Sequence, residues 1–172
     1  MSMNKILIVS DSHNNQVLLR QALAAASDAD TIFHLGDNYE DLDDNIDLTR
    51  DKKVLKVPGI FHPRYLNGSL PVRLYTDIAG WKFLLIHDPR DLDNFAVKAD
   101  IILYGHTHTW QFKKQSGKYY INPGHLKSND DKGRIPTFAL LEVEKSMIRV
   151  IFKNMKNEDI EIINIKRIPE EK

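Results

Sequence analysis

The chain has 172 residues, of which 42% are hydrophobic, and its formal net charge is zero. This length and apolar content predict a single domain over residues 1–172 with one substantial core. The neutral charge balance excludes the basic surface of a dedicated nucleic-acid binder, and the absence of cysteine excludes disulfides and thiolate metal sites. The sequence shows no signal-peptide pattern and no membrane-spanning apolar run, so we expect a cytoplasmic protein without a membrane partner.

The first half alternates strand and helix patterns. Residues 6–9 form a continuous apolar run typical of a strand buried on both faces, and the leucine- and alanine-rich residues 16–26 predict a helix. Strands are predicted next at residues 31–35 and 53–57, joined by an acidic helix and loop at 40–51. Strands at 72–77 and 82–86, a helix at 91–99 and a strand at 101–104 complete this half.

The second half is rich in strand patterns. The predicted strands are residues 110–115, 118–122, 137–144, 147–153 and 161–167. An α/β first half followed by a β-rich second half predicts two sheets packed face to face, with helices on their outer faces.

Metal-binding side chains follow three of the predicted strands. Asp11 and His13 come after the first strand, Asp37 after the second, and His106 and His108 after the strand at 101–104. Carboxylates and imidazoles without thiolates suit Mn²⁺, Fe²⁺, Co²⁺, Ni²⁺ or Zn²⁺ better than Ca²⁺. Because ligand sites in open α/β sheets lie at the carboxyl ends of strands, these motifs indicate a two-metal site in which Asp37 bridges the ions.

Each motif alone has a simpler interpretation. Asp11 or the adjacent Ser12 could cap the following helix, Asp37 could lie in a turn, and the two histidines could be an ordinary loop pair. The occurrence of all three motifs after strands favours the metal site.

Two further motifs complete a recognisable order, a lone His87 after a strand and Asn122-Pro123-Gly124. Together with the three motifs above, they make residues 5–166 resemble the calcineurin-like metallophosphoesterase superfamily. Within it the chain is most similar to small bacterial and archaeal phosphodiesterases that also resemble the retromer subunit. The resemblance implies a four-layer α-β-β-α sandwich of two mixed sheets, two divalent transition-metal ions with Mn²⁺ favoured, a phosphoester substrate and a homodimer. It assigns ligands to the first metal (Asp11, His13, His108), to the bridge (Asp37) and to the second metal (His87, His106).

One loop departs from the family pattern. Family enzymes carry Gly-Asn, then His or Cys, then an acidic residue, whereas here Gly59 is followed by Ile60, Phe61 and His62. Ile60 cannot ligate the second ion, and Phe61 cannot protonate a leaving group. His62 is therefore our candidate catalytic acid or replacement ligand, and the alternative is that it caps a surface turn. Asp88, next to the lone histidine, either contributes a ligand or orients one.

Two functions follow from this pattern. In the first, the protein is a metal-dependent phosphodiesterase in which a metal-bridging hydroxide attacks phosphorus. In the second, it is a catalytically weakened scaffold of the same fold. The retention of all six liganding side chains favours the enzyme, because a scaffold has no physical need for them.

Overall fold

Two mixed β-sheets make up most of the protein. The computed structural model describes residues 3–92 and 98–167. One sheet has the strand order β11-β10-β9-β1-β2-β3 and the other the order β4-β5-β6-β8-β7. The strands of the first sheet are β1 (Asn4–Val9), β2 (Thr31–His34), β3 (Lys53–Lys56), β9 (Thr137–Val143), β10 (Met147–Asn154) and β11 (Asp159–Lys166). Those of the second are β4 (Arg73–Ile78), β5 (Trp81–Ile86), β6 (Ile101–Leu103), β7 (Gln111–Gln115) and β8 (Lys118–Asn122).

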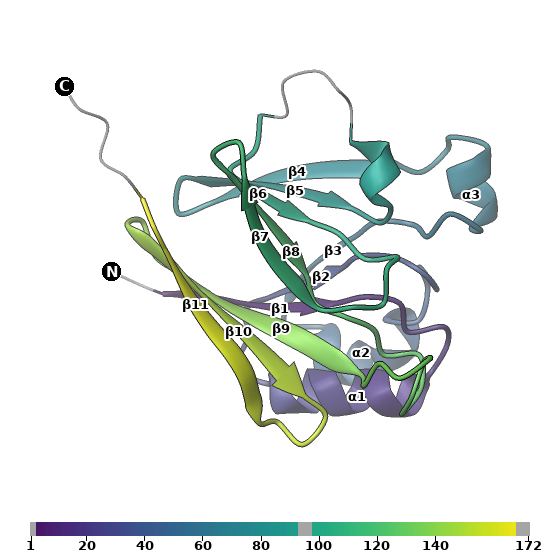
Figure 1. The fold of residues 1–172 in the computed structure, drawn as a ribbon. Helices are drawn as coiled ribbons and strands as arrows, with labels where there is room; N and C mark the ends of the chain where they lie inside the picture. The colour runs from purple at the N-terminus through teal and green to yellow at the C-terminus, as the bar shows by residue number, and fades with distance from the viewer. Residues whose placement is uncertain (1–2, 93–97, 168–172) are drawn as a thin grey trace.

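Each sheet combines three parallel strands with antiparallel ones. Strands β1, β2 and β3 run parallel, and β9, β10 and β11 extend the sheet with antiparallel pairs. Strands β5, β6 and β8 also run parallel, with β4 and β7 antiparallel at the edges. The carboxyl ends of β1, β5 and β6 point to the same side of the molecule, on the right in Figure 1. This shared edge is where the two halves of the chain can contribute to one site.

The main core lies between the two sheets. Because successive strand residues point to opposite faces, Ile6 and Ile8 of β1 face the second sheet while Leu7 and Val9 face the helices. All four side chains are fully buried, which explains the uninterrupted apolar run of β1. The expected two-sheet fold is therefore confirmed.

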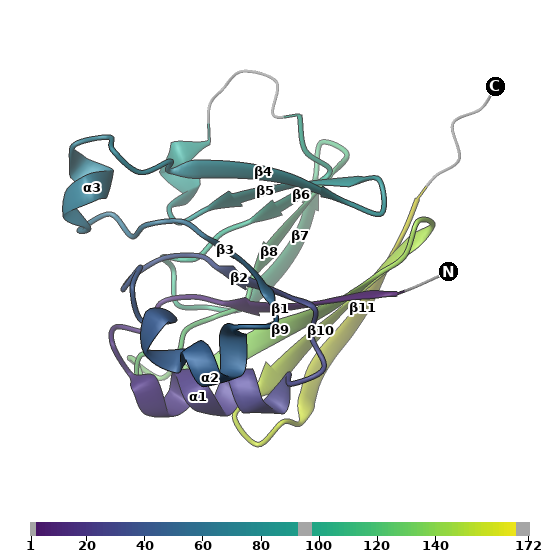
Figure 2. The same ribbon diagram turned by 180° about the vertical axis from the view of Figure 1, so that it is seen from behind.

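Helices cover the outer face of the six-stranded sheet (Figure 2). α1 (Gln16–Ala25) begins at Asn15, whose side chain accepts a hydrogen bond from the Leu18 amide at 3.1 Å. The acidic segment forms the short helices η1 (Asp43–Asn45) and α2 (Ile46–Thr49) beside α1, as the sequence predicts. No helix in the described part of the chain is long and apolar enough to cross a membrane.

The outer face of the five-stranded sheet carries a smaller apolar cluster. The helix predicted at 91–99 falls mostly on residues 93–97, which lie outside the described residues. Beside that gap are the 3₁₀ helix η2 (Pro89–Asp91), Leu92 and Ala99. Leu92 and Ala99 belong to one apolar cluster with Leu84, Ile86, Ile102, Tyr104 and Tyr120.

Candidate metal centre

The predicted ligands come from loops at one edge of the two sheets. Asp11 follows β1, Asp37 follows β2, His87 follows β5 directly, and His106 follows β6. The Asp11 amide donates to the Gly36 carbonyl at 3.0 Å, which ties the first two loops together. The parallel strands thus bring together side chains that are far apart in the sequence.

Four of the predicted ligands form the first ligand group, which consists of Asp11, His13, Asp37 and His108. Their potential ligand atoms lie within 4.8 Å of one another. His13 Nε2 lies 3.1 Å from His108 Nε2 and 3.2 Å from Asp37 Oδ2, and His108 Nε2 lies 3.2 Å from Asp11 Oδ1. Ligand atoms that share one ion through bonds of about 2.0–2.2 Å lie roughly 3 Å apart, so these separations fit a single divalent ion.

Asp37, His87 and His106 form the second ligand group. The second carboxylate oxygen of Asp37, Oδ1, lies 3.5 Å from His87 Nε2. The ring centroids of His87 and His106 lie 5.3 Å apart. Because the Leu35 carbonyl can only accept, His87 Nδ1 must carry the proton of their 2.7 Å hydrogen bond. The ring thereby turns Nε2 away from Leu35, and this fully buried atom has no hydrogen-bond partner among the described residues. A buried nitrogen without a partner is costly, and an ion bridged by Asp37 would satisfy it.

Asp11 is the most deeply buried carboxylate of the site. Its Oδ2 accepts hydrogen bonds from the Ser10 hydroxyl at 2.5 Å and from the His106 amide at 3.0 Å. Its Oδ1 also accepts from this amide, at 3.2 Å, and faces His108. Burial raises the pKa of the Asp11 carboxyl, but hydrogen bonding to His108, the charge of His87 and the Ser10 hydroxyl together lower it further, below its usual value. Asp11 is thus held as the anion that a metal ion requires.

The backbone at the ligands is unusual. Five of the six predicted ligands have a positive φ in the left-handed region: Asp11 (53°), His13 (46°), Asp37 (48°), His106 (65°) and His108 (58°). This conformation is uncommon for residues other than glycine and costs about 1–3 kcal/mol each. Such outliers cluster where a function requires them, so their concentration here supports a functional site.

Close approach explains two glycines of the site. A Cβ at Gly105 would lie 2.0 Å from Ser10 Oγ and 2.7 Å from Asp11 Oδ2, and one at Gly59 would lie 2.0 Å from Asp37 Oδ1. Both contacts are far shorter than real Cβ contacts, so glycine is needed beside each carboxylate.

Asp131 is a member of the site that sequence reasoning missed. It lies in the loop after β8, is 7% exposed, and its Oδ2 accepts the proton of His108 Nδ1 at 2.7 Å. Arg134 Nη2 at 2.8 Å and Lys127 Nζ at 3.2 Å hold the carboxylate in place. The hydrogen bond from His108 is the largest cause that holds the pKa of Asp131 well below its usual value. This contact orients the His108 ring so that Nε2 points toward His13 and Asp11, where it would bind a metal ion.

His62 lies outside both ligand groups. It caps α3 (Pro63–Leu66), which the sequence analysis did not predict, by accepting from the Arg64 amide through Nδ1 at 3.2 Å. Its Nε2 faces Glu40 Oε1 at 3.0 Å. His62 and the 81% exposed Phe61 nevertheless line a cavity of about 290 Å³ that also includes His13 and Asp37. The structure therefore places His62 beside the candidate centre and not within it.

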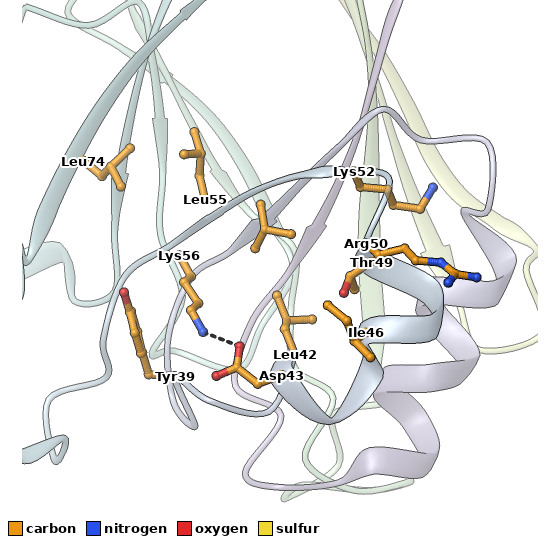
Figure 3. A pocket seen from close by; sticks show the side chains of 11 residues that line it. Tyr39, Leu42, Asp43, Ile46, Thr49, Arg50, Lys52, Leu55, Lys56 and Leu74 are labelled. Atoms are coloured by element: carbon orange, nitrogen blue, oxygen red, sulfur yellow. Dashed lines mark hydrogen bonds and ion pairs between the residues drawn. The ribbon is translucent and has the colours of Figure 1, made fainter.

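A larger cavity of about 470 Å³ lies elsewhere, against β3 (Figure 3). Aliphatic side chains such as Leu42 and Leu55 line it together with basic ones, and its Lys56 forms an ion pair with Asp43 at 3.0 Å. None of the predicted metal ligands lines this cavity. Volume alone therefore does not identify the site.

Comparisons with known proteins identify the family of the chain. Residues 3–146 match the calcineurin-like phosphoesterase superfamily domain. The chain is 27% identical over 164 residues to the phosphodiesterase MJ0936 of Methanocaldococcus jannaschii, covering 86% of this chain and 98% of that protein.

Two crystal structures share the fold. One is a conserved protein of Streptococcus pneumoniae TIGR4, termed a predicted phosphoesterase, with a TM-score of 0.70, 21% identity and coverage of 97% of this chain and 99% of the other. The second is Vps29 of Entamoeba histolytica in complex with Zn²⁺, with a TM-score of 0.67, 20% identity and coverage of 94% and 98%. The match over residues 3–146 establishes that the chain belongs to the calcineurin-like phosphoesterase superfamily.

Proposed function

We propose that the protein is a metal-dependent phosphodiesterase with a two-metal site formed by the two ligand groups. One observation carries this proposal. Asp37 directs Oδ2 toward His13 in the first group and Oδ1 toward the buried, unpartnered Nε2 of His87 in the second. A single carboxylate placed between two sets of nitrogen donors is what a pair of neighbouring divalent ions requires. The similarity to MJ0936, itself a phosphodiesterase, supports the same reaction class.

The residues of the chain have distinct parts in this function. When bound, two divalent ions supply Lewis acidity and an activated water for attack on phosphorus. The Leu35 carbonyl and the Asp131 carboxylate orient His87 and His108 so that both present Nε2. The cavity beside His13 and Asp37 provides space for part of the substrate. His62 lines this cavity, and we propose it as the catalytic residue that donates a proton to the leaving group.

The donor set also limits the choice of metal. Imidazoles and carboxylates without sulfur suit Mn²⁺, Fe²⁺, Co²⁺, Ni²⁺ and Zn²⁺, and among these we propose Mn²⁺, the ion that the family resemblance favours. A scaffold function is the second candidate. It is favoured by the loop in which Ile60 and Phe61 replace a ligand and a proton donor, and by the similarity in fold to Vps29.

Metal content and turnover distinguish the two candidates. The protein is purified without chelator, its bound metals are counted by mass spectrometry, and bis-p-nitrophenyl phosphate hydrolysis is measured with added Mn²⁺. We expect two ions per chain and turnover that is lost on chelation. A protein that neither binds metal nor turns over this ester, with or without Mn²⁺, would be a scaffold.

A further inference from the structure

The second ligand group lacks one side chain relative to the first. The first group has four potential ligands, whereas the second has Asp37, His87 and His106, and Ile60 occupies the position of the missing asparagine. A site with a buried histidine and an incomplete ligand set would hold its ion weakly. Another oxygen donor near His106 would complete the set.

Asp88 meets the geometric requirement. Its side chain is 3% exposed, and its Oδ2 lies 3.5 Å from His106 Nε2. The same distance separates His87 Nε2 from Asp37 Oδ1 within this group. Both separations are close to the roughly 3 Å between atoms that share one ion, so a small inward movement of each side chain would complete a coordination sphere.

The present partner of Asp88 can be displaced. Arg90 donates to Asp88 Oδ2 through Nε at 2.8 Å and Nη2 at 2.6 Å, while its backbone amide donates to Oδ1 at 2.8 Å. The Arg90 side chain is 77% exposed, whereas the Asp88 carboxylate is only 3% exposed and needs a cation beside it. When a metal ion takes that place, the guanidinium can move into solvent, while the backbone hydrogen bond keeps the carboxylate in position.

We propose that Asp88 completes the second metal site in place of the missing asparagine, and that Arg90 competes with the ion for Asp88 Oδ2. The inference rests on the proposed two-metal function and adds a ligand and a competitor to it. The second ion would then be held by Asp37, His87, His106 and Asp88. With Asp11 the pair of sites would contain three carboxylates, which favours harder divalent ions such as Mn²⁺.

Two variants with opposite effects test the proposal. Asp88→Ser keeps an oxygen that can cap η2 but is too short to reach the ion. At Mn²⁺ concentrations that give two ions in the wild type, this variant should hold one, with second-ion affinity lowered more than about 100-fold, beyond the usual effect of losing an orienting partner. Arg90→Ala should raise second-ion affinity by about fivefold or more, because a pair with a buried carboxylate is worth at least as much as the strongest exposed pairs. Asp91→Ser, the same change within η2, should leave both ions bound.

The measurement is calorimetric titration of metal-free protein with Mn²⁺ in about 0.5 M salt, which screens the long-range effect of removing a charge. Two ions bound with wild-type affinity in Asp88→Ser would overturn the inference and leave the two-metal function intact. Unchanged or weaker second-ion binding in Arg90→Ala would also overturn it, because it would mean that Arg90 supports an orienting role of Asp88. Wild-type protein that binds no ion would refute the proposed function itself.

Discussion

Asp37→Asn is the most direct test of the two-metal arrangement. The substitution keeps the shape of the side chain but replaces one of its two oxygens by an amide NH₂. Since Oδ2 lies 3.2 Å from His13 Nε2 and Oδ1 lies 3.5 Å from His87 Nε2, either orientation of the amide removes a ligand from one group. The lost negative charge weakens both sites, so we expect at most one ion to remain bound.

The magnitude follows from linkage between binding and folding. Each ion present at 100 times its dissociation constant stabilises the folded state by about 2.7 kcal/mol. For a chain of 172 residues, 1 kcal/mol raises the melting temperature by roughly 2–4 °C, so each ion adds about 5–11 °C. Mn²⁺ should therefore raise the melting temperature of the wild type by about 10–20 °C and that of Asp37→Asn by half as much or less.

Thermal melts with Mn²⁺ and with chelator measure this difference. Asp43→Asn is the matched control, because Asp43 is an exposed aspartate of the acidic segment that follows Asp37 and pairs with Lys56. The control should keep the full metal-dependent shift. A full shift and two bound ions in Asp37→Asn would refute the bridging role.

Three further predictions concern other parts of the site. Asp131→Asn should lower the affinity for the first ion by about 10–100-fold, because His108 loses its carboxylate partner. Asp130→Asn is the control, and equal metal affinities of the two variants would contradict the role of Asp131. In metal-free protein, the lowered pKa of Asp11 contributes stability that is complete above its unfolded pKa of about 3.9 and is lost as the pH falls through the folded value. Asp11→Asn should therefore show a shallower loss of stability than the wild type in denaturant melts between pH 5 and 2, and parallel curves would count against it. If His62 is the general acid, His62→Ala should slow alkyl esters about 10²–10⁴-fold more than nitrophenyl esters. If it is a replacement ligand, both ester types should slow alike with loss of the second ion, and unchanged rates would leave it as the cap of α3.

The sequence predicted the parts of the fold that repeat a simple pattern. β1 was recognisable because both of its faces are buried, and α1 because leucines and alanines favour a helix. α3 was missed because its four residues include no buried side chain and thus show no apolar periodicity. Its only signal was Pro63 at the first helical position, after a histidine that is not a common cap.

The candidate site was predictable only where ligands follow strands. The six predicted ligands could be found because each lies just beyond an apolar run. Asp131 could not, because it contacts His108 across 23 residues from an irregular loop that also carries other charged residues. Asp88 was noticed in sequence as the neighbour of His87, but only the structure shows that its carboxylate faces His106.

The left-handed backbone at the ligands implies a conflict between binding metal and folding without it. Only glycine adopts this conformation without steric cost, yet glycine offers no ligand atom. His13 has a φ of 46°, which is strained for a residue with a Cβ. Its side chain is 34% exposed, so removing it would cost little packing energy. His13→Gly should therefore give a metal-free protein at least as resistant to denaturant as the wild type, and one that gains less stability from Mn²⁺. The variant would then be at least as stable as the wild type without metal, and the wild type would be the more stable protein with Mn²⁺. A histidine at this position thus benefits the folded protein only where metal is available.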